Sequence, residues 1–114
     1  MASGIIIHVT VGLEKRTEFF AQERIRIGSD SSCDIQIHTS SVRDVNVWLE
    51  IESSDGQFRV VDFAPELEFQ FNGKPIRRYV PISDADSIAA PESSISFDFF
   101  SLEAKSALIT TNRE

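Results

Sequence analysis

The sequence predicts an all-β protein, a two-sheet antiparallel β-sandwich, and three observations support this fold class. Apolar and polar residues alternate over most of the short segments, which is the period of a half-buried strand. Turn residues separate the segments, most clearly Asp55-Gly56 and Asn72-Gly73, because both dipeptides accept positive φ at low cost. Short strands at regular spacing with turns between them are typical of a sandwich.

The chain is long enough for one domain with a packed core. It has 114 residues, of which 41% are hydrophobic and nine are Phe, so it can bury enough apolar area to offset the entropy of the chain. The single Cys33 excludes an internal disulfide and favours a cytoplasmic location. We expect a sandwich domain over residues 1–102 and a tail or short helix over residues 103–114.

The strand pattern begins near the N-terminus. Residues 5–11 alternate regularly, and residues 17–27 predict a second strand with Phe19 and Ile25 facing inward. The other strands are expected at residues 34–38, 45–52, 58–63, 68–71, 76–80, a short piece at 88, and 95–102. The inward positions predict a core that contains Ile7, Ile25, Ile27, Ile35, Val47, Leu49, Val60, Ile88, Phe97 and Phe99.

Trp48 stands out in the strand expected over residues 45–52. Alternation places Val47 and Leu49 inward, so Trp48 and Glu50 are expected on the outer face. An exposed Trp is typical of interface hot spots, which makes Trp48 with Glu50 a candidate partner surface. In the alternative interpretation, Trp48 lies under a loop or the C-terminal tail and only fills the fold.

The run IRIGSDSSCDIQIHTSSVRDVNVWLEI, residues 25–51, resembles a forkhead-associated (FHA) domain. Ile27-Gly28 and Cys33-Asp34-Ile35 have the spacing of the family's IGRxxxCDI block. Further along, Asn72-Gly73 with Ile76 is similar to the family's VNGxxI hairpin, and residues 82–88 to its LxDGDxI turn. The resemblance implies a sandwich of the SMAD/FHA type, which binds phosphothreonine peptides through loops at one end.

Several positions that handle phosphate in that family differ here. Ser29 stands where the family has Arg, Arg43 where it has the phosphate-binding Ser, and Asn46 where it has the His that braces the loop. Leu67 replaces the Asn that holds the peptide backbone. The candidate peptide and phosphate loops therefore contain Gly28, Ser29, Ser31, Arg43, Asn46 and Leu67. A shift of one residue would instead align Arg43 with the family's Arg, and it would also turn Trp48 inward.

Other classes of protein lack support in the sequence. The net charge is −7 and the only dense basic spot is Arg77-Arg78, which argues against nucleic-acid binding. No apolar run approaches the ~18 residues of a membrane-spanning helix. Neither a metal-ligand spacing nor a nucleophile motif occurs, so we expect no metal, no cofactor and no enzymatic activity. Asp84 and Asp86 are interpreted as a turn rather than a metal site.

The sequence thus predicts a non-catalytic protein-protein interaction module with a protein or peptide partner. Two alternatives remain. The chain is a genuine phosphothreonine-peptide domain, or it is a structural domain of a larger assembly or a homo-oligomer.

Overall fold

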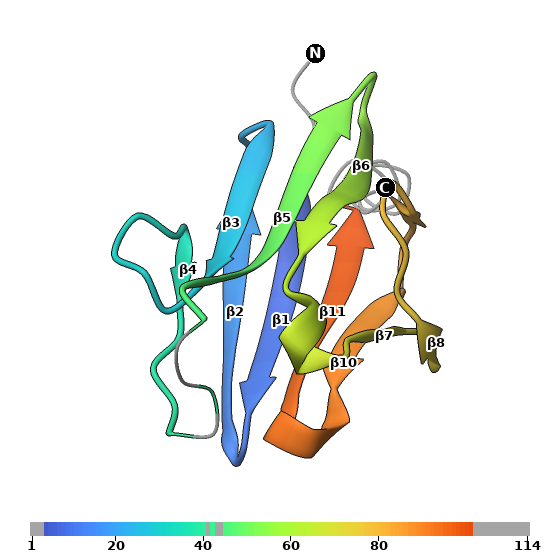
Figure 1. Cartoon of the computed structure of the whole chain (residues 1–114). Helices are drawn as coiled ribbons and strands as arrows, with labels where there is room; N and C mark the ends of the chain where they lie inside the picture. The colour runs from blue at the N-terminus through green and yellow to red at the C-terminus, as the bar shows by residue number, and fades with distance from the viewer. Residues whose placement is uncertain (1–3, 41, 43–44, 102–114) are drawn as a thin grey trace, which may run out of the picture.

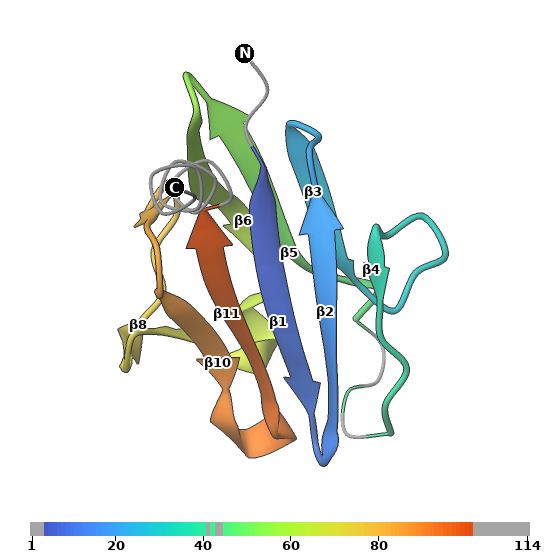
Figure 2. The same cartoon turned by 180° about the vertical axis from the view of Figure 1, so that it is seen from behind.

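The structure, a computed structural model, describes residues 4–40, 42 and 45–101, and these residues form two facing sheets (Figures 1 and 2). The strands of one sheet are β1 (Ile5–Val11), β2 (Glu14–Phe20), β7 (Gln70–Phe71), β8 (Lys74–Pro75), β10 (Ser87–Ala90) and β11 (Ile95–Ser101). Those of the other are β3 (Arg24–Gly28), β4 (Ile35–Gln36), β5 (Val47–Ser54), β6 (Gln57–Phe63) and β9 (Pro81–Ile82). Two single 3₁₀ turns complete the described part, η1 (Pro65–Leu67) and η2 (Pro91–Ser93).

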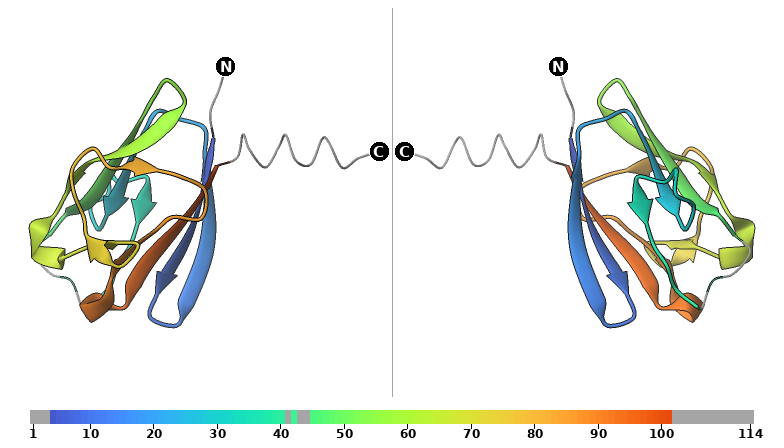
Figure 3. Two further views of the ribbon diagram at one scale, coloured as in Figure 1. Left: turned by 90° about the vertical axis from the view of Figure 1, so that its right-hand side faces the viewer. Right: turned by 90° about the vertical axis from the view of Figure 1, so that its left-hand side faces the viewer.

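The strand order confirms the predicted sandwich. The first sheet runs β2-β1-β11-β10-β7-β8 and the second β4-β3-β5-β6-β9. Within the described residues every pairing is antiparallel except that of β3 with β4. Figure 3 shows the two sheets from the side, where they form two layers.

The core forms where the inward positions of the two sheets meet. Nine of the ten predicted core residues are buried, and Ile7, Ile25 and Phe97 have no exposed area.

The two predicted hairpin turns are also confirmed. Asp55 and Gly56 have φ values of 56° and 80°, and those of Asn72 and Gly73 are 51° and 86°. Two consecutive positive φ values suit the twist of a two-residue hairpin.

Two of the predicted strands are wrong. Residues 17–27 form parts of two strands in different sheets, β2 and β3, and Phe19 is 56% exposed rather than inward. The β1–β2 hairpin turns at Gly12, whose φ is +62°, and its register sets Phe19 opposite Ile6 on the outer face. Residues 76–80 are not a strand, because Tyr79 takes a left-handed backbone with φ of 67°.

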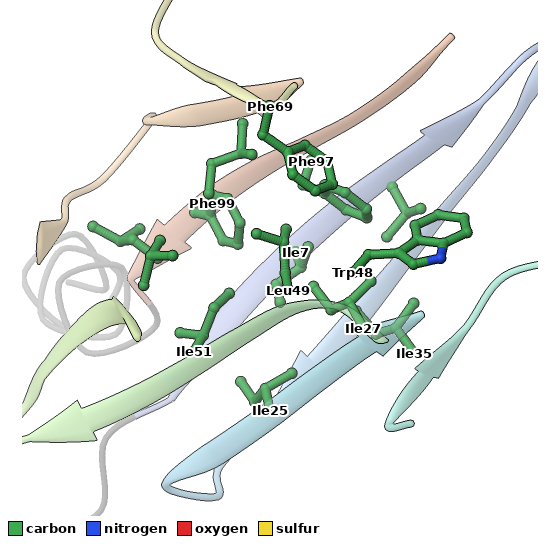
Figure 4. Packing of buried hydrophobic residues seen from close by; sticks show 14 of the residues in the cluster. Ile7, Ile25, Ile27, Ile35, Trp48, Leu49, Ile51, Phe69, Phe97 and Phe99 are labelled. Carbon is green, nitrogen blue, oxygen red and sulfur yellow. The ribbon is translucent and has the colours of Figure 1, made fainter. Parts of the chain in front are cut away.

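The prediction that Trp48 faces outward is also wrong. Trp48 has no exposed area and lies among the core side chains (Figure 4), whereas Val47 is only half-buried. The cause is a β-bulge in β5: Ile27 pairs with Leu49 while the next residue, Gly28, pairs with Val47, so Trp48 is the extra residue. A bulge inserts one residue and breaks the alternation of faces, and both Trp48 and Leu49 therefore enter the core.

The end of the chain gives no test of the predicted domain boundary. The expected tail or short helix over residues 103–114 lies outside the described residues, as does Leu102. In the part of the chain that is described, no helix is long and apolar enough to cross a membrane.

Candidate functional site at the loop end

The loop that follows β3 is fixed to the residues that lead into β5. The backbone carbonyl of Asn46 accepts hydrogen bonds from the N–H groups of Ser29 (3.0 Å) and Asp30 (3.1 Å). The loop closes on itself where the Cys33 N–H donates to the Asp30 carbonyl at 3.0 Å. These bonds use backbone donors that an open loop would present to an anion.

The carbonyl of Val45 is a second anchor, and two side chains donate to it. The Trp48 indole Nε1–H donates at 2.9 Å and the Ser29 hydroxyl at 3.1 Å. A hydroxyl has only one proton, so Ser29 donating to Val45 has no proton left for a phosphate oxygen. The Trp48 indole therefore ties β5 to the segment that precedes it, whereas Asn46, which stands where the family has a His, has an exposed side chain.

Gly28 is required where β3 passes β5. A Cβ atom at Gly28 would lie 2.3 Å from the Asn46 carbonyl oxygen and 2.9 Å from the Cα of Val47. Both contacts are with backbone, which cannot rotate away. Gly28 therefore lets β3 approach β5 closely, so that the carbonyls of Val45 and Asn46 can accept the hydrogen bonds described above.

Cys33 packs under the same loop. Its Sγ lies 3.8 Å from the Asn46 carbonyl oxygen, and burial raises the pKa of the thiol. A thiol with a raised pKa is mostly protonated at neutral pH and is a poor nucleophile. This confirms the interpretation of Cys33 as a small buried side chain.

The loop after β6 carries no phosphate or peptide donor at the expected position. Leu67 ends the 3₁₀ turn η1 and packs, half-buried, against the core. Glu68 follows with φ of 51°, the left-handed conformation that suits the Gly of the family's loop. This turn is joined through β5 to the loop after β3 and to the residues that lead into β5, because the Ala64 N–H donates to the Trp48 carbonyl at 2.9 Å.

The charges near the loop do not favour a phosphate. Hydrogen bonds from the side chain and backbone of Ser32 lower the pKa of Asp30, so this neighbour of Ser29 is a carboxylate at neutral pH. Arg26 is already engaged, with its Nε 3.0 Å from Glu50 Oε2 and its Nη1 donating to Ser32 Oγ at 3.2 Å. Among the described residues, a phosphate placed beside Ser29 would therefore lie near the Asp30 carboxylate and near an Arg26 that is already paired.

The structure brings only some of the candidate residues together. Gly28, Ser29 and the backbone of Asn46 meet around the Val45 and Asn46 carbonyls, and Ser31 is exposed on the same loop. Arg43 lies outside the described residues, so its part in a site stays a prediction. Glu50, from the predicted partner surface, is on the outer face in its ion pair with Arg26, while Trp48, two residues before it, is buried.

Asp86 serves as a turn residue, as expected. Its Oδ2 accepts from the Ser83 N–H at 2.7 Å, and its Oδ1 accepts from Asn72 Nδ2 at 3.0 Å. Asn72 Oδ1 in turn accepts from the Ser87 N–H at 2.9 Å. Asn72 and Asp86, which match the family's motifs, therefore hold the β7–β8 hairpin to β10. Among the described residues, no group of three or more His, Cys, Asp or Glu side chains is arranged to hold a metal ion.

The comparisons with known proteins agree with this architecture. Residues 25–90 match the family model described as FHA domain. The FHA domain of the CT664 protein from Chlamydia trachomatis is similar in fold, with a TM-score of 0.70 and 17% identity over 86% of this chain and 97% of that one. No curated protein is detectably similar in sequence.

Two further solved structures share the fold. The cytoplasmic domain of the T3SS sorting platform protein PscD from P. aeruginosa has a TM-score of 0.70 and 16% identity, over 83% of this chain and 78% of that one. The yeast Dun1 FHA domain, solved with a doubly phosphorylated (pT) peptide, has a TM-score of 0.66 and 16% identity, over 89% of this chain and 75% of that one.

Proposed function

The chain belongs to the FHA domain family, a family of non-catalytic protein-protein interaction modules, and we propose that it recognises its partner without a phosphothreonine pocket. The observation that carries the proposal is the use of the Ser29 hydroxyl and the Trp48 indole as donors to one carbonyl, that of Val45. A site for a phosphate dianion needs several free donors and cations. In the described loop end, the Ser29 hydroxyl and the backbone N–H groups of Ser29 and Asp30 already donate to carbonyls of the protein itself.

The proposal has three further parts. The chain has no catalytic role, which is what its family membership supports. It is cytoplasmic, for which the support is the single Cys33 in a chain of this size. Its partner is a protein or peptide rather than a nucleic acid, because the net charge of −7 repels a polyanion.

Paired peptides test the proposal that the chain has no phosphothreonine pocket. A library of phosphothreonine peptides, each titrated beside its unmodified form by calorimetry, should show no consistent preference for the phosphorylated member. The physical reason is that the Ser29 hydroxyl and the Ser29 and Asp30 N–H groups already donate within the protein, and that Asp30 is negatively charged. One phosphopeptide that binds at low micromolar affinity, and loses that affinity in Arg43→Ala, would establish a phosphothreonine site and contradict the proposal.

The same samples address self-association, the second alternative. Light scattering coupled to size exclusion gives the mass of the particle directly. A monomer is the expected result for a module that binds a separate partner, whereas a stable dimer would favour the structural or homo-oligomerising alternative.

A further inference from the structure

A basic groove lies on the side of the sandwich away from the loop after β3. It runs between the β7–β8 hairpin and the segment that leads into β9, has a volume of about 570 Å³, and is lined by Phe71, Lys74, Pro75, Arg77, Arg78 and Val80. β8 and β9 are the edge strands of their sheets, so the groove follows the open edge of the sandwich. Figure 1 shows β8 and β4 on opposite sides of the molecule.

The lining of this groove is cationic in an otherwise acidic chain. Lys74, Arg77 and Arg78 are all exposed, and the lining contains no carboxylate. Within the described residues, neither Lys74 nor Arg77 has an ion pair. Two cations beside an apolar floor, in a protein with net charge −7, are complementary to a carboxylate-bearing ligand.

Arg78 is held in place at the rim of the groove. Its Nη2 donates to Asp62 Oδ1 at 2.8 Å, and its guanidinium lies over the Phe63 ring, 5.3 Å from the ring centre. The hydrogen bond from Arg78 lowers the pKa of Asp62, so the pair is charged at neutral pH. Arg78 therefore shapes the rim, while Lys74 and Arg77, which have no ion pair within the described residues, are available to a ligand.

The next residue, Tyr79, is an exposed aromatic in a strained backbone. It is 65% exposed, and its φ of 67° is a conformation that costs a non-Gly residue free energy. The segment is fixed to β6, because the Tyr79 N–H donates to the Val60 carbonyl and the Val60 N–H donates to the Val80 carbonyl. An aromatic side chain kept exposed beside a groove is typical of binding surfaces.

Both edge strands are poorly suited to the addition of another strand. Pro75 lies in β8 and Pro81 in β9, and Pro has no N–H to donate to an added strand. Recognition here must therefore come chiefly from side chains.

We propose that this groove binds an acidic segment of a partner protein, with carboxylates on Lys74 and Arg77 and an apolar side chain on the floor formed by Phe71, Pro75 and Val80. The inference deepens the proposed function by naming the chemistry of the partner, and it rests on the chain being an interaction module. A nucleic acid is disfavoured, because only three cations face the groove and the rest of the chain repels a polyanion.

The test uses the whole chain and a short synthetic peptide in which glutamates flank a pair of Phe residues. Calorimetry at low salt should detect binding, and Arg77→Glu should weaken it about tenfold because an attraction becomes a repulsion. Lys15→Glu is the matched control, because it makes the same change of charge at an exposed side chain on β2; it should change the affinity less than about twofold. Replacing the glutamates of the peptide by Gln should weaken binding as much as Arg77→Glu does.

Three results would overturn the inference. The first is no binding of the acidic peptide at low salt, and the second is an equal loss of affinity in Arg77→Glu and Lys15→Glu. The third is that oligothymidylate displaces a fluorescently labelled form of the peptide at a lower concentration than the unlabelled peptide does. Circular dichroism of each variant shows whether it is folded, and Arg77→Ala, expected to weaken binding less than Arg77→Glu, provides a second variant. The outcome is separable from that of the phosphothreonine titration. A phosphopeptide held only by the groove would lose affinity in Arg77→Glu and keep it in Ser29→Ala, whereas a loop-end site would show the reverse.

Discussion

Replacing Trp48 by Ala should lower the free energy of unfolding by about 3–5 kcal/mol, the range for removing a large aromatic from a core. Trp48 has no exposed area, and its loss also leaves the Val45 carbonyl without its indole donor. In a domain of this size the melting temperature should fall by more than about 10 °C. Thermal and urea unfolding followed by circular dichroism measure the change.

Trp48→Phe provides the matched control, because it keeps an aromatic ring in the core but removes the N–H. We expect it to cost less than Trp48→Ala and still to destabilise by about 1–3 kcal/mol, from the lost hydrogen bond and the reduced volume. A Trp48→Ala protein with the melting temperature of the wild type would mean that Trp48 is not in the core, and the outer-face interpretation would be restored.

Gly28→Ala should be the most damaging change of a single methyl group in the loop region. The added Cβ would meet two backbone atoms of residues 46 and 47 at 2.3 and 2.9 Å, so β3 and β5 must move apart. Overpacking costs about 1–3 kcal/mol where side chains can adjust, and we expect the upper end of that range or more because the backbone cannot. Urea unfolding measures it.

Gly73→Ala separates this crowding from backbone strain. Gly73 has φ of +86°, and a Cβ added there would have no neighbouring atom within 4 Å, so the variant experiences strain without a clash. Its expected cost is about 1 kcal/mol. Equal losses in the two variants would show that the close passage of β3 and β5 contributes nothing of its own.

The parts of the fold that could be predicted are those governed by local pattern. The alternation of residues 5–11 and the dipeptides Asp55-Gly56 and Asn72-Gly73 determine strands and turns without help from distant residues. The bulge at Trp48 could not be predicted in this way, because it depends on how β5 pairs with β3. One extra residue reverses the faces, so alternation alone assigned Trp48 to the wrong side.

The candidate site was predictable in its positions but not in its chemistry. The spacing of the family blocks located Gly28 and Ser29 on a loop near Asn46, and the structure brings them together. The spacing does not reveal that the Ser29 hydroxyl and the Trp48 indole both donate to the Val45 carbonyl, because this depends on the three-dimensional arrangement of the chain. The basic pair Arg77-Arg78 was visible in the sequence, but the groove around it requires the fold of residues 71–80.

The Trp48 indole N–H gives the most direct test that the loop end is internally bonded rather than open to phosphate. Trp48 is the single Trp of the chain, so its indole signal in a ¹H–¹⁵N NMR spectrum needs no assignment. As a phosphothreonine peptide is added, we expect this signal and the amide signals of Ser29 and Asp30 to stay in place, because their hydrogen bonds to residues 45 and 46 persist. Saturable shifts of these three signals with the phosphopeptide, and not with its unmodified form, would contradict the account.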